Sequence, residues 1–417
     1  MSTACDEAGL ERVELSWGSD STLDGEGRTV HILRDVLDLE ADMVEMRRHF
    51  HAHPELSFEE HETALFIVQK LKGMGITEIL TGVGKTGVVA FIRGEAGPGP
   101  MIGLRADMDA LPVQESADVA YRSVNVGVMH ACGHDGHMAE LLGAAQVLFK
   151  RKHTMKGAVK LIFQPAEEGR GGARAMIADG VMDGIDFIYG IHLWSFDALG
   201  SVACRSGPVM AASDKFCIEI KGKGGHGAAP QGTVDAIVSA ATLVTSLQTI
   251  VARNKDPLES GVVTVGTING GFGYNVIADQ VMLTGTCRSF NPETQKLIKN
   301  RMECLCCGIA SAYGGEIFLD YQYGYPPTIN AYPECVEVVT TAAAKIVGAA
   351  HSALPQKTMG AEDFSYFLQQ KPGAFFFVGA SLPGEVRPHH KSVFDFDERA
   401  MLIAASIFVQ IVQDVLC

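Results

Sequence analysis

The sequence predicts an α/β protein with a mostly parallel sheet, interrupted by a smaller inserted domain, and three observations support this. Over residues 31–212, apolar segments of strand length alternate with segments whose apolar residues recur at helical spacing. From residue 213 to 325 the order becomes β-α-β-β-α-β, which is typical of a ferredoxin-like domain. After residue 326 the α/β alternation resumes. We therefore expect one domain from 31–212 and 326–417, and an inserted domain at 213–325.

The first domain is predicted element by element from this periodicity. Residues 1–30 are polar and partly Gly-rich, which suggests a loosely held N-terminal extension. Apolar positions at helical spacing indicate helices, and short apolar runs bounded by turn residues indicate strands. The expected helices lie at 31–50, 137–151, 172–179 and 398–415, and the expected strands at 87–93, 101–105, 157–163 and 187–193.

The inserted domain has its own sequence of elements. Its strands are expected at 214–220, 261–267, 280–288 and 316–323, and its helices at 234–252 and 292–312. A Gly-rich stretch at 222–227 follows the first strand, and the segment Tyr325-Pro326-Pro327-Thr328 would return the chain to the first domain.

The composition excludes several classes of protein. The 417 residues are 47% hydrophobic and 20% charged, and the net charge of −15 without a basic cluster argues against a nucleic-acid partner. No apolar run reaches the roughly 18 residues of a membrane helix. The acidic N-terminus lacks a signal-peptide core, and ten cysteines in so long a chain do not suggest a disulfide framework. We therefore expect a cytoplasmic protein with no membrane partner.

The segment Met129–His137 is the most informative part of the chain. It contains one thiol, three imidazoles and a carboxylate within nine residues, and a tandem carboxylate, Glu167-Glu168, follows in a Pro-Ala-Glu-Glu-Gly turn. Cys, His and Glu are ligands that suit zinc, or manganese where oxygen dominates. Of two adjacent glutamates, one can bind metal while the other transfers protons. These residues predict the centre of a metal-dependent hydrolase.

Four polar clusters follow strands of the first domain, and their convergence is the main evidence. They are residues 105–109, the Cys132/His134 segment, Glu167-Glu168, and His192. In open α/β sheets, ligands bind outside the carboxyl ends of the strands. His192 alone would more often be a hydrogen-bonded core residue, but with the other clusters present we expect it to be a ligand.

Each cluster also has a simpler explanation. Cys132 could be buried packing, or a nucleophile with His134 as its base, as in cysteine hydrolases. Adjacent glutamates are commonly a solvated turn, although the strand before Glu167 is strongly apolar. Because the extra imidazole and the tandem carboxylate are unexplained by a cysteine nucleophile, a metal site is the better account.

Seven strings carry a family resemblance. They resemble the amidohydrolase branch of the dinuclear metallopeptidases, which includes hippurate hydrolase, bacterial N-acyl-amino-acid amidohydrolases (aminoacylases) and plant hydrolases of indole-acetyl amino acids. The likeness covers about residues 35–415. The strings are RADMDALP (105–112), ACGHDGHMAELLGAA (131–145), QPAEEG (164–169), GIHLW (190–194), GGHGAAP (224–230), NVIADQV (275–281) and GAEDFSYF (360–367).

The resemblance implies two divalent ions per subunit, zinc or manganese, with cobalt or nickel as further candidates. The implied ligands are Cys132, His134, Glu168, His192 and a late histidine. In the family this histidine stands four residues before an aromatic, and counting back from Phe394 gives His390. This sequence lacks the usual proline there and His389 is adjacent, so the choice between the two stays open.

The resemblance also implies roles for other residues. Glu167 would be the general base, and Asp107 would orient a ligand from behind.

The inserted domain would be a lid and dimerisation domain. Its His226 would polarise the scissile carbonyl, often in the neighbouring subunit's site, so a homodimer or a dimer of dimers is expected. Asn275 and Arg288 would hold the substrate carboxylate, although Arg288 could equally form an ordinary ion pair at a strand end. The Gly-rich stretch lacks the Lys-Ser/Thr of a phosphate-binding loop.

Together these inferences predict a metal-dependent amidohydrolase that cleaves N-acyl amino acids, as small-molecule substrates, into a carboxylic acid and a free amino acid. A dipeptidase or carboxypeptidase on the same scaffold is the alternative within enzymes. A non-catalytic protein that only binds metal or ligand is disfavoured, because Glu167 is present.

Overall fold

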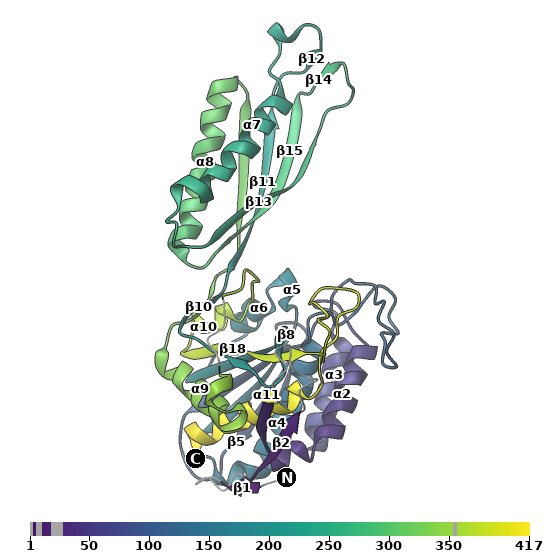
Figure 1. Ribbon diagram of the computed structural model, residues 1–417, viewed down its shortest axis with the longest axis vertical. Coiled ribbons are helices and arrows are strands. Elements are labelled where there is room, and N and C mark those ends of the chain that lie inside the picture. Colours follow the sequence, from purple (N-terminus) through teal and green to yellow (C-terminus); the bar gives the residue numbers. More distant parts are fainter. Residues whose placement is uncertain (1–2, 6–10, 18–27, 353–356) are drawn as a thin grey trace. The chain divides into compact units, whose positions relative to one another are not determined.

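The computed structural model describes residues 3–5, 11–17, 28–352 and 357–417. It separates into two compact units, which are considered individually (Figure 1). The larger unit comprises Met1–Gly207, Ile329–Gln356 and Tyr366–Cys417, and the smaller unit comprises Pro208–Thr328 and Lys357–Ser365. The predicted boundaries placed 357–365 in the first domain. The structure groups this segment with the smaller unit, where the amide of Ala211 donates to the carbonyl of Gly360 at 2.8 Å.

The larger unit is built on a seven-stranded sheet of order β4-β5-β7-β6-β8-β18-β9. Its four central strands, β7, β6, β8 and β18, are parallel, and the outer strands are antiparallel to their neighbours. This confirms the predicted α/β class with a parallel central sheet. The strands are β4 (Ile79–Val83), β5 (Gly87–Arg93), β6 (Met101–Asp107), β7 (Ala158–Gln164), β8 (Phe187–Ala198), β9 (Val202–Ala203) and β18 (Gly373–Ser381).

Helices pack on this sheet and on one another. Helix α4 packs against α2 and α11, and α11 also packs against α9. Nearly every residue of α11 is buried, as expected for a helix that is apolar on all sides. The helices are α1 (Arg34–Leu37), α2 (Glu40–Ala52), α3 (His61–Gly73), α4 (His134–Arg151), η2 (Lys152–Thr154), α5 (Glu167–Arg170), α6 (Gly172–Ala178), α9 (Pro333–Val347), η5 (Ala349–His351), α10 (Ser365–Leu368) and α11 (Ala400–Leu416).

The N-terminal residues form a second sheet in this unit, with strand order β1-β2-β3. Its strands are β1 (Thr3–Cys5), β2 (Glu11–Trp17) and β3 (Arg28–Leu33). Val13 is fully buried, and Arg12 donates to Gln410 of α11 at 2.7 Å. The expectation of a loosely held extension is therefore wrong for residues 11–17, whose apolar residues alternate as in a strand. Residues 1–2, 6–10 and 18–27 of that extension lie outside the described residues.

The smaller unit has the predicted β-α-β-β-α-β order. Its four-stranded antiparallel sheet has the order β13-β15-β11-β16, and helices α7 and α8 cover one face (Figure 1). The elements are β11 (Ala212–Lys221), β12 (Gly225–His226), η3 (Pro230–Gly232), α7 (Ala236–Thr249), η4 (Ile250–Asn254), β13 (Gly261–Gly270), β14 (Val276–Ile277), β15 (Gln280–Ser289), α8 (Pro292–Tyr313) and β16 (Glu316–Tyr325), with β10 (Gly207–Met210) and β17 (Thr328–Asn330) at the boundaries.

The core of this unit forms between the sheet and its helices. Leu243 and Leu247 of α7 are fully buried in one cluster with Phe216 and Ile218 of β11. Within the described residues, one helical segment, Ala236–Asn254, is long and apolar enough to cross a membrane by length and composition alone.

Candidate metal centre

The parallel strands bring the predicted site residues to one edge of the larger sheet. Strand β6 ends at Asp107, and β7 ends at Gln164, three residues before Glu167. Strand β8 carries His192, two residues beyond Gly190, which pairs with Arg105 of β6. Because the carboxyl ends of neighbouring parallel strands lie together, side chains distant in the sequence become neighbours here.

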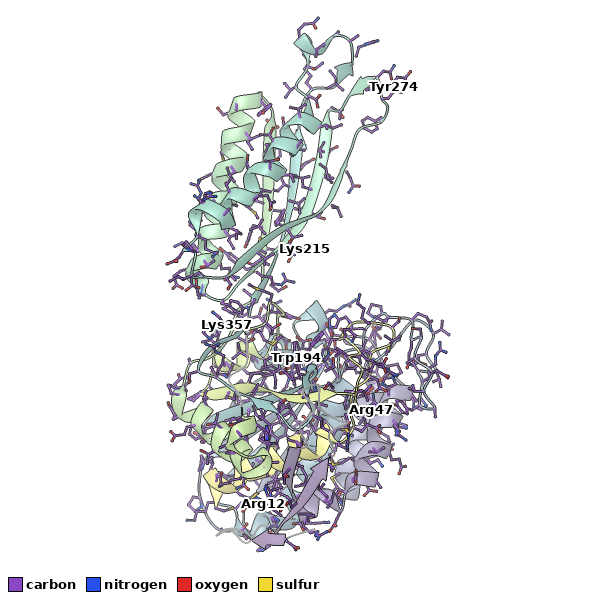
Figure 2. All side chains as sticks on the ribbon, viewed as in Figure 1. Arg12, Arg47, Trp194, Lys215, Tyr274 and Lys357 are labelled. Atoms are coloured by element: carbon purple, nitrogen blue, oxygen red, sulfur yellow. The ribbon has the colours of Figure 1, made fainter. Side chains whose placement is uncertain are left out.

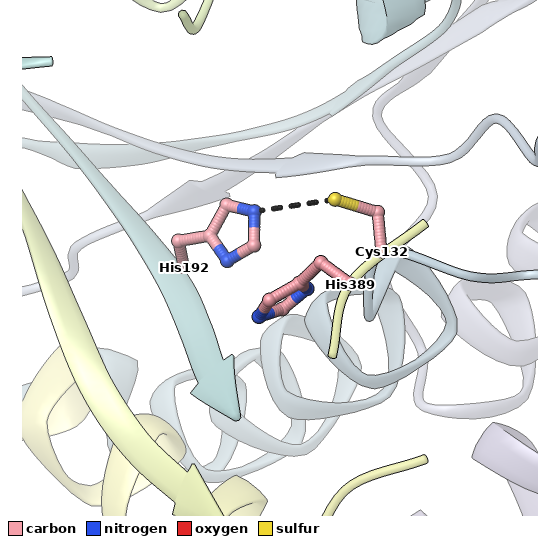
Figure 3. Close-up of side chains that lie close together, drawn as sticks. All are labelled: Cys132, His192 and His389. Carbon is pink, nitrogen blue, oxygen red and sulfur yellow. Dashed lines mark hydrogen bonds between the residues drawn. The ribbon is translucent and has the colours of Figure 1, made fainter. Parts of the chain in front are cut away.

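Cys132 and His192 face each other (Figure 3). The Cys132 Sγ lies 3.6 Å from the His192 Nε2. Ligand atoms of Cys132, His192 and His389 all lie within 4.8 Å of one another. Sulfur and nitrogen bound to one tetrahedral zinc would be roughly 3.6 Å apart, given bonds of about 2.3 and 2.05 Å. The spacing of Cys132 and His192 therefore fits two ligands of one ion.

A second group contains the same thiol. Ligand atoms of Cys132, His134 and Glu168 also lie within 4.8 Å of one another. The His134 Nδ1 hydrogen-bonds to the backbone oxygen of Asp109 at 2.8 Å, so this nitrogen carries the proton. The buried Nε2 is then left with its lone pair and has no hydrogen-bond partner among the described residues. These two groups, which share Cys132, could together hold two metal ions.

His192 is likewise oriented as a ligand. Its Nδ1 donates to the backbone oxygen of Leu193 at 2.7 Å, which leaves the Nε2 lone pair toward Cys132. Burial, together with neighbouring His137 and His389, holds the pKa of His192 well below its usual range. A neutral imidazole is the form that binds metal.

The charges around His134 favour a cation. Burial would lower the pKa of His134, but Asp107, Asp109 and Glu168 outweigh it and raise the pKa to about 10. Without a metal ion these carboxylates favour a second proton on the ring. A divalent ion at the Nε2 would take the place of that proton and compensate the same negative charge.

The two late histidines point to different places. The His390 amide donates to the Ala131 oxygen at 2.7 Å in a turn where His390 has a φ of 63°. His389 joins Cys132 and His192, but its Nε2 hydrogen-bonds to the amide of Ser195 at 3.1 Å.

His390 instead places its Nε2 3.2 Å from the Oε1 of Glu168, and its side chain is 54% exposed. Two nitrogen or oxygen ligands of one tetrahedral ion would be roughly 3.4 Å apart. In the structure, His389 therefore lies with Cys132 and His192, and His390 lies beside Glu168. The count from Phe394 had selected His390 and not His389.

Asp107 lies beside the proposed ligand His134 and is held by several hydrogen bonds. Its carboxylate receives a hydrogen bond from Arg105 at 2.7 Å and one from the His137 Nδ1 at 2.6 Å, and it lies 3.6 Å from the His134 Nε2. Burial would raise its pKa, but Arg105, His134 and His137 outweigh this and hold the pKa well below its ordinary value. Asp107 is therefore ionised beside the ligands.

The role of His137 was missed from the sequence. The Leu193 amide donates to its Nε2 at 2.9 Å, so its Nδ1 carries the proton that is donated to Asp107. Both nitrogens are therefore engaged in support. The signal was the spacing of His134 and His137, which places them one turn apart on the same face of α4.

The tandem glutamates do not form a solvated turn. Glu167 is only 6% exposed, in a turn where Ala166 and Gly169 have positive φ angles of 54° and 78°. Burial would raise the pKa of the nearby Asp109 carboxyl. The hydrogen bond and the charge of His134 outweigh burial and lower this pKa, together with hydrogen bonds from Ser57 and from the Glu168 amide. Glu167 is thus fixed next to Glu168 at the same edge of the sheet.

A buried ionic network supports the same region from behind (Figure 2 labels Arg47). Arg47 of α2 is fully buried and contacts both Asp135 and Asp395 at 2.8 Å. Asp135 also accepts a hydrogen bond from His51 at 2.7 Å. Because Asp135 follows His134 and Asp395 lies in the segment after the late histidines, Arg47 connects two segments that carry candidate ligands.

His226 and Asn275 lie together in the smaller unit. His226 of β12 pairs with Val276 of β14, and the carbonyl of Asn275 accepts the Gly227 amide at 2.8 Å. The His226 Nδ1 accepts the Ala228 amide at 3.0 Å. His226 and Asn275 are both exposed.

Arg288 lies toward the other end of this unit. It pairs with Ser213 and donates to the Cys287 carbonyl at 3.0 Å and to the Thr286 hydroxyl. The ion pair considered from the sequence is absent, since no carboxylate among the described residues lies within ion-pairing distance of Arg288.

The length of β15 separates these groups. Arg288 lies eight residues after Gln280, a separation of roughly 27 Å along a strand, and Figure 2 shows Tyr274 at one end of the unit and Lys215 at the other. Asn275 and Arg288 of one chain therefore lie far apart, and their binding of a substrate carboxylate stays a prediction.

An α/β sheet with Cys, His and Glu ligand atoms grouped at the carboxyl ends of its parallel strands defines the class of metal-dependent hydrolases. The chain belongs to the peptidase family M20/M25/M40, whose model matches residues 103–414. The resemblance seen in the sequence motifs is thereby confirmed.

Individual relatives agree with this family. The chain is 44% identical to an N-acetyl-L-cysteine deacetylase of Bacillus subtilis, over 89% of this chain and 87% of the relative. It is 42% identical to thermostable carboxypeptidase 2 of Saccharolobus solfataricus, over 89% of this chain and 94% of the relative. The crystal structure of the Bacillus subtilis YXEP protein, a dinuclear metal binding peptidase of the M20 family, superimposes with a TM-score of 0.80 at 34% identity, covering 91% and 99% of the two chains.

Proposed function

We propose that this chain is a metal-dependent amidohydrolase that cleaves the amide bond of N-acyl amino acids, releasing a carboxylic acid and a free amino acid. The observation that carries the proposal is the pair of ligand groups that share Cys132, with Glu167 fixed beside the ligand Glu168. The 44% identity to a deacetylase of an N-acetylated amino acid supports this reaction class.

The donor set fits two divalent ions, zinc or manganese. The proposed ligands are Cys132, His134, Glu168, His192 and His390. In support, the Nε2 of His134 is buried without a hydrogen bond among the described residues, and His390 and Glu168 have the spacing of two ligands of one ion. When bound, such ions polarise a carbonyl oxygen and lower the pKa of a water ligand.

The role proposed for Glu167 follows from its place in the chain. It is adjacent to Glu168, is buried, and stands in a turn with a fixed backbone. Its carboxylate would accept a proton from the attacking water and return it to the leaving nitrogen, as a general base and then a general acid. Asp107, held ionised by Arg105 and His137, lies 3.6 Å from the His134 Nε2 and would add negative charge beside the ions, whereas the His134 Nδ1 is held by Asp109.

The proposed assembly is a homodimer joined through the smaller units. Strand β13 is an edge strand of its sheet, and Ile237 and Val238 of α7 and Ile268 of β13 are 45–55% exposed. Exposed edges and apolar side chains favour pairing with a second copy. In such a dimer, His226 would act in the partner's site, and Asn275 and Arg288 would hold the substrate carboxylate.

Mixed dimers test this assembly. His226→Ala and Glu167→Gln, each inactive alone, would place both defects in one site of a mixed dimer and neither in the other. We expect activity to recover toward about half of wild type per mixed dimer if His226 acts across the interface. No recovery, with subunit exchange shown independently by labelled subunits, would contradict action in trans.

A carboxypeptidase or dipeptidase is the second candidate, favoured by the 42% identity to a carboxypeptidase. Both substrates contain an amide whose nitrogen belongs to an amino acid with a free carboxylate, and they differ in the acyl side. Rates on N-acetyl amino acids, N-benzoyl amino acids and dipeptides would decide. We expect kcat/KM for the best acyl amino acid to exceed that for dipeptides about tenfold or more. Faster dipeptide cleavage would favour the second candidate, and no hydrolysis by metal-loaded protein would contradict both.

A further inference from the structure

Asp109 contacts three elements of the proposed site at once. Its Oδ1 accepts the Glu167 amide at 3.0 Å, and its Oδ2 accepts the Glu168 amide at 3.0 Å. Its backbone oxygen accepts the His134 Nδ1–H at 2.8 Å. The residue is fully enclosed, at 1% exposure, and Ser57 donates its hydroxyl to the Oδ2 at 2.7 Å. One residue thus touches the proposed base and two proposed ligands.

The turn that carries the glutamates needs such support. Ala166 adopts a left-handed conformation, with a φ of 54°, and a non-glycine residue there is disfavoured. Glu168 also departs from helical geometry, with a ψ of 74°. Conformations of this kind persist where the surrounding structure fixes them. Besides Asp109, Glu60 supplies support by accepting the Ala166 amide at 2.9 Å.

The chemistry of this contact requires a carboxylate. Two consecutive backbone N–H groups point at Asp109, and each needs an acceptor because the site is buried. An ionised aspartate offers two acceptor oxygens, whereas an asparagine offers one oxygen and an NH₂ group that is only a donor. Replacement by asparagine would therefore set a donor against one amide, with almost no change of volume.

We propose that Asp109 is a positioning residue that fixes the proposed base Glu167 relative to the proposed ligands Glu168 and His134, by binding the backbone of the first two and the ring of the third. This inference rests on the proposed function. Asp109 would not touch the substrate. It would act by holding the glutamate turn and the His134 ring at fixed positions relative to each other. Its loss should therefore lower both metal affinity and kcat.

The chain offers a matched control for this contact. Glu55 also accepts two consecutive backbone amides, from Glu62 at 3.2 Å and from Thr63 at 2.8 Å, at the start of α3. Glu55→Gln makes the same chemical change as Asp109→Asn, with no candidate ligand on the two amides. It separates the general cost of a lost carboxylate from an effect on the metal centre.

The experiment measures zinc affinity of the apoprotein against a chromophoric chelator, and kcat and KM of the zinc-loaded protein. We expect Asp109→Asn to weaken at least one zinc ion about 10- to 100-fold and to lower kcat, with KM nearly unchanged. Glu55→Gln should keep both zinc ions and kcat. Unchanged zinc affinity in Asp109→Asn, or an equal loss in Glu55→Gln, would overturn the inference.

A second variant keeps the test decisive if Asp109→Asn fails to fold. Ser57→Ala removes one hydrogen bond to the same carboxylate and should weaken zinc about twofold to tenfold; wild-type affinity in that folded variant would overturn the inference. The proposed function fails separately, if the wild-type chain binds no zinc ions or if the zinc-loaded wild type cleaves no acyl amino acid.

Discussion

The edge of the larger sheet and the β12–β14 tip of the smaller unit both carry candidate functional histidines, but in opposite surroundings. At the sheet edge, His134 and His192 are buried, and each has one ring nitrogen bound to a backbone oxygen. At the tip, His226 is exposed, and the neighbouring Tyr274 is fully exposed.

This difference indicates two ways of using an imidazole. At the sheet edge, the backbone hydrogen bond to one ring nitrogen of His134 and of His192 fixes the direction in which the other nitrogen points, as a metal ligand requires. A histidine that is proposed to contact substrate bound to another subunit would be enclosed only when the two subunits associate. It can therefore be exposed in the single chain. The following predictions test this contrast, from the largest expected effect to the smallest.

Removal of the shared thiol should have the largest effect. Cys132→Ala takes one ligand from both groups, so we expect loss of both metal ions and a fall in kcat of about 10³-fold or more, since metal supplies several kcal/mol of transition-state stabilisation. Elemental analysis and steady-state kinetics measure this. Cys335→Ala, which removes a buried thiol from α9, is the control. Activity that survives exhaustive chelation would show that the sheet edge does not depend on metal.

Arg47 should matter for stability far more than an exposed arginine. Arg47→Met leaves Asp135 and Asp395 as buried carboxylates without this partner, which should cost about 3–5 kcal/mol of unfolding free energy. Arg93→Met breaks an exposed pair with Glu78 and should cost about 0–1 kcal/mol. Urea unfolding of the metal-free protein gives both values, and similar values would refute the distinction between the two surroundings.

Glu167→Gln should separate proton transfer from metal binding. The substitution keeps size and removes the proton acceptor, so kcat should fall by about 10²-fold or more while metal content stays at the wild-type level. Loss of metal together with rate would instead make Glu167 a ligand. Glu140→Gln is a suitable control, because burial and Asp107 raise the pKa of Glu140 well above its ordinary value, and glutamine resembles its protonated form.

The two late histidines should differ by a smaller amount. His390→Ala removes a proposed ligand beside Glu168, and we expect zinc affinity to fall about 10- to 100-fold. His389→Ala removes a ring beside Cys132 and His192 whose Nε2 accepts the Ser195 amide and whose Nδ1 has no hydrogen-bond partner among the described residues. If His390 is the ligand, we expect a change of about threefold or less. Zinc titration of both apoproteins measures this, and a larger loss for His389→Ala would reverse the assignment.

Much of the fold could be predicted from local patterns. The alternation of strands and helices indicated the parallel central sheet, and the β-α-β-β-α-β order indicated the smaller unit. The structure of two regions could not be predicted in this way. Residues 11–17 have the alternation of a strand, but their partner, β3, lies beyond an intervening segment, and the apolar residues at the end of β3 also fit the helical spacing of residues 31–50. Residues 357–365 pack with the smaller unit through contacts that follow no local period.

The sequence by itself determined the kinds of ligand atoms, the tandem carboxylate and the family, because residue types and their spacing along the chain are local properties. Only the tertiary structure decided which ring nitrogen of His134 and of His192 is bound to a backbone oxygen, where His389 and His390 lie, and that Asn275 and Arg288 of one chain lie far apart. The physical reason is that these properties depend on hydrogen bonds and strand register between distant segments. His137 contacts Asp107, 30 residues away, and Leu193, 56 residues away, and no local pattern encodes such contacts.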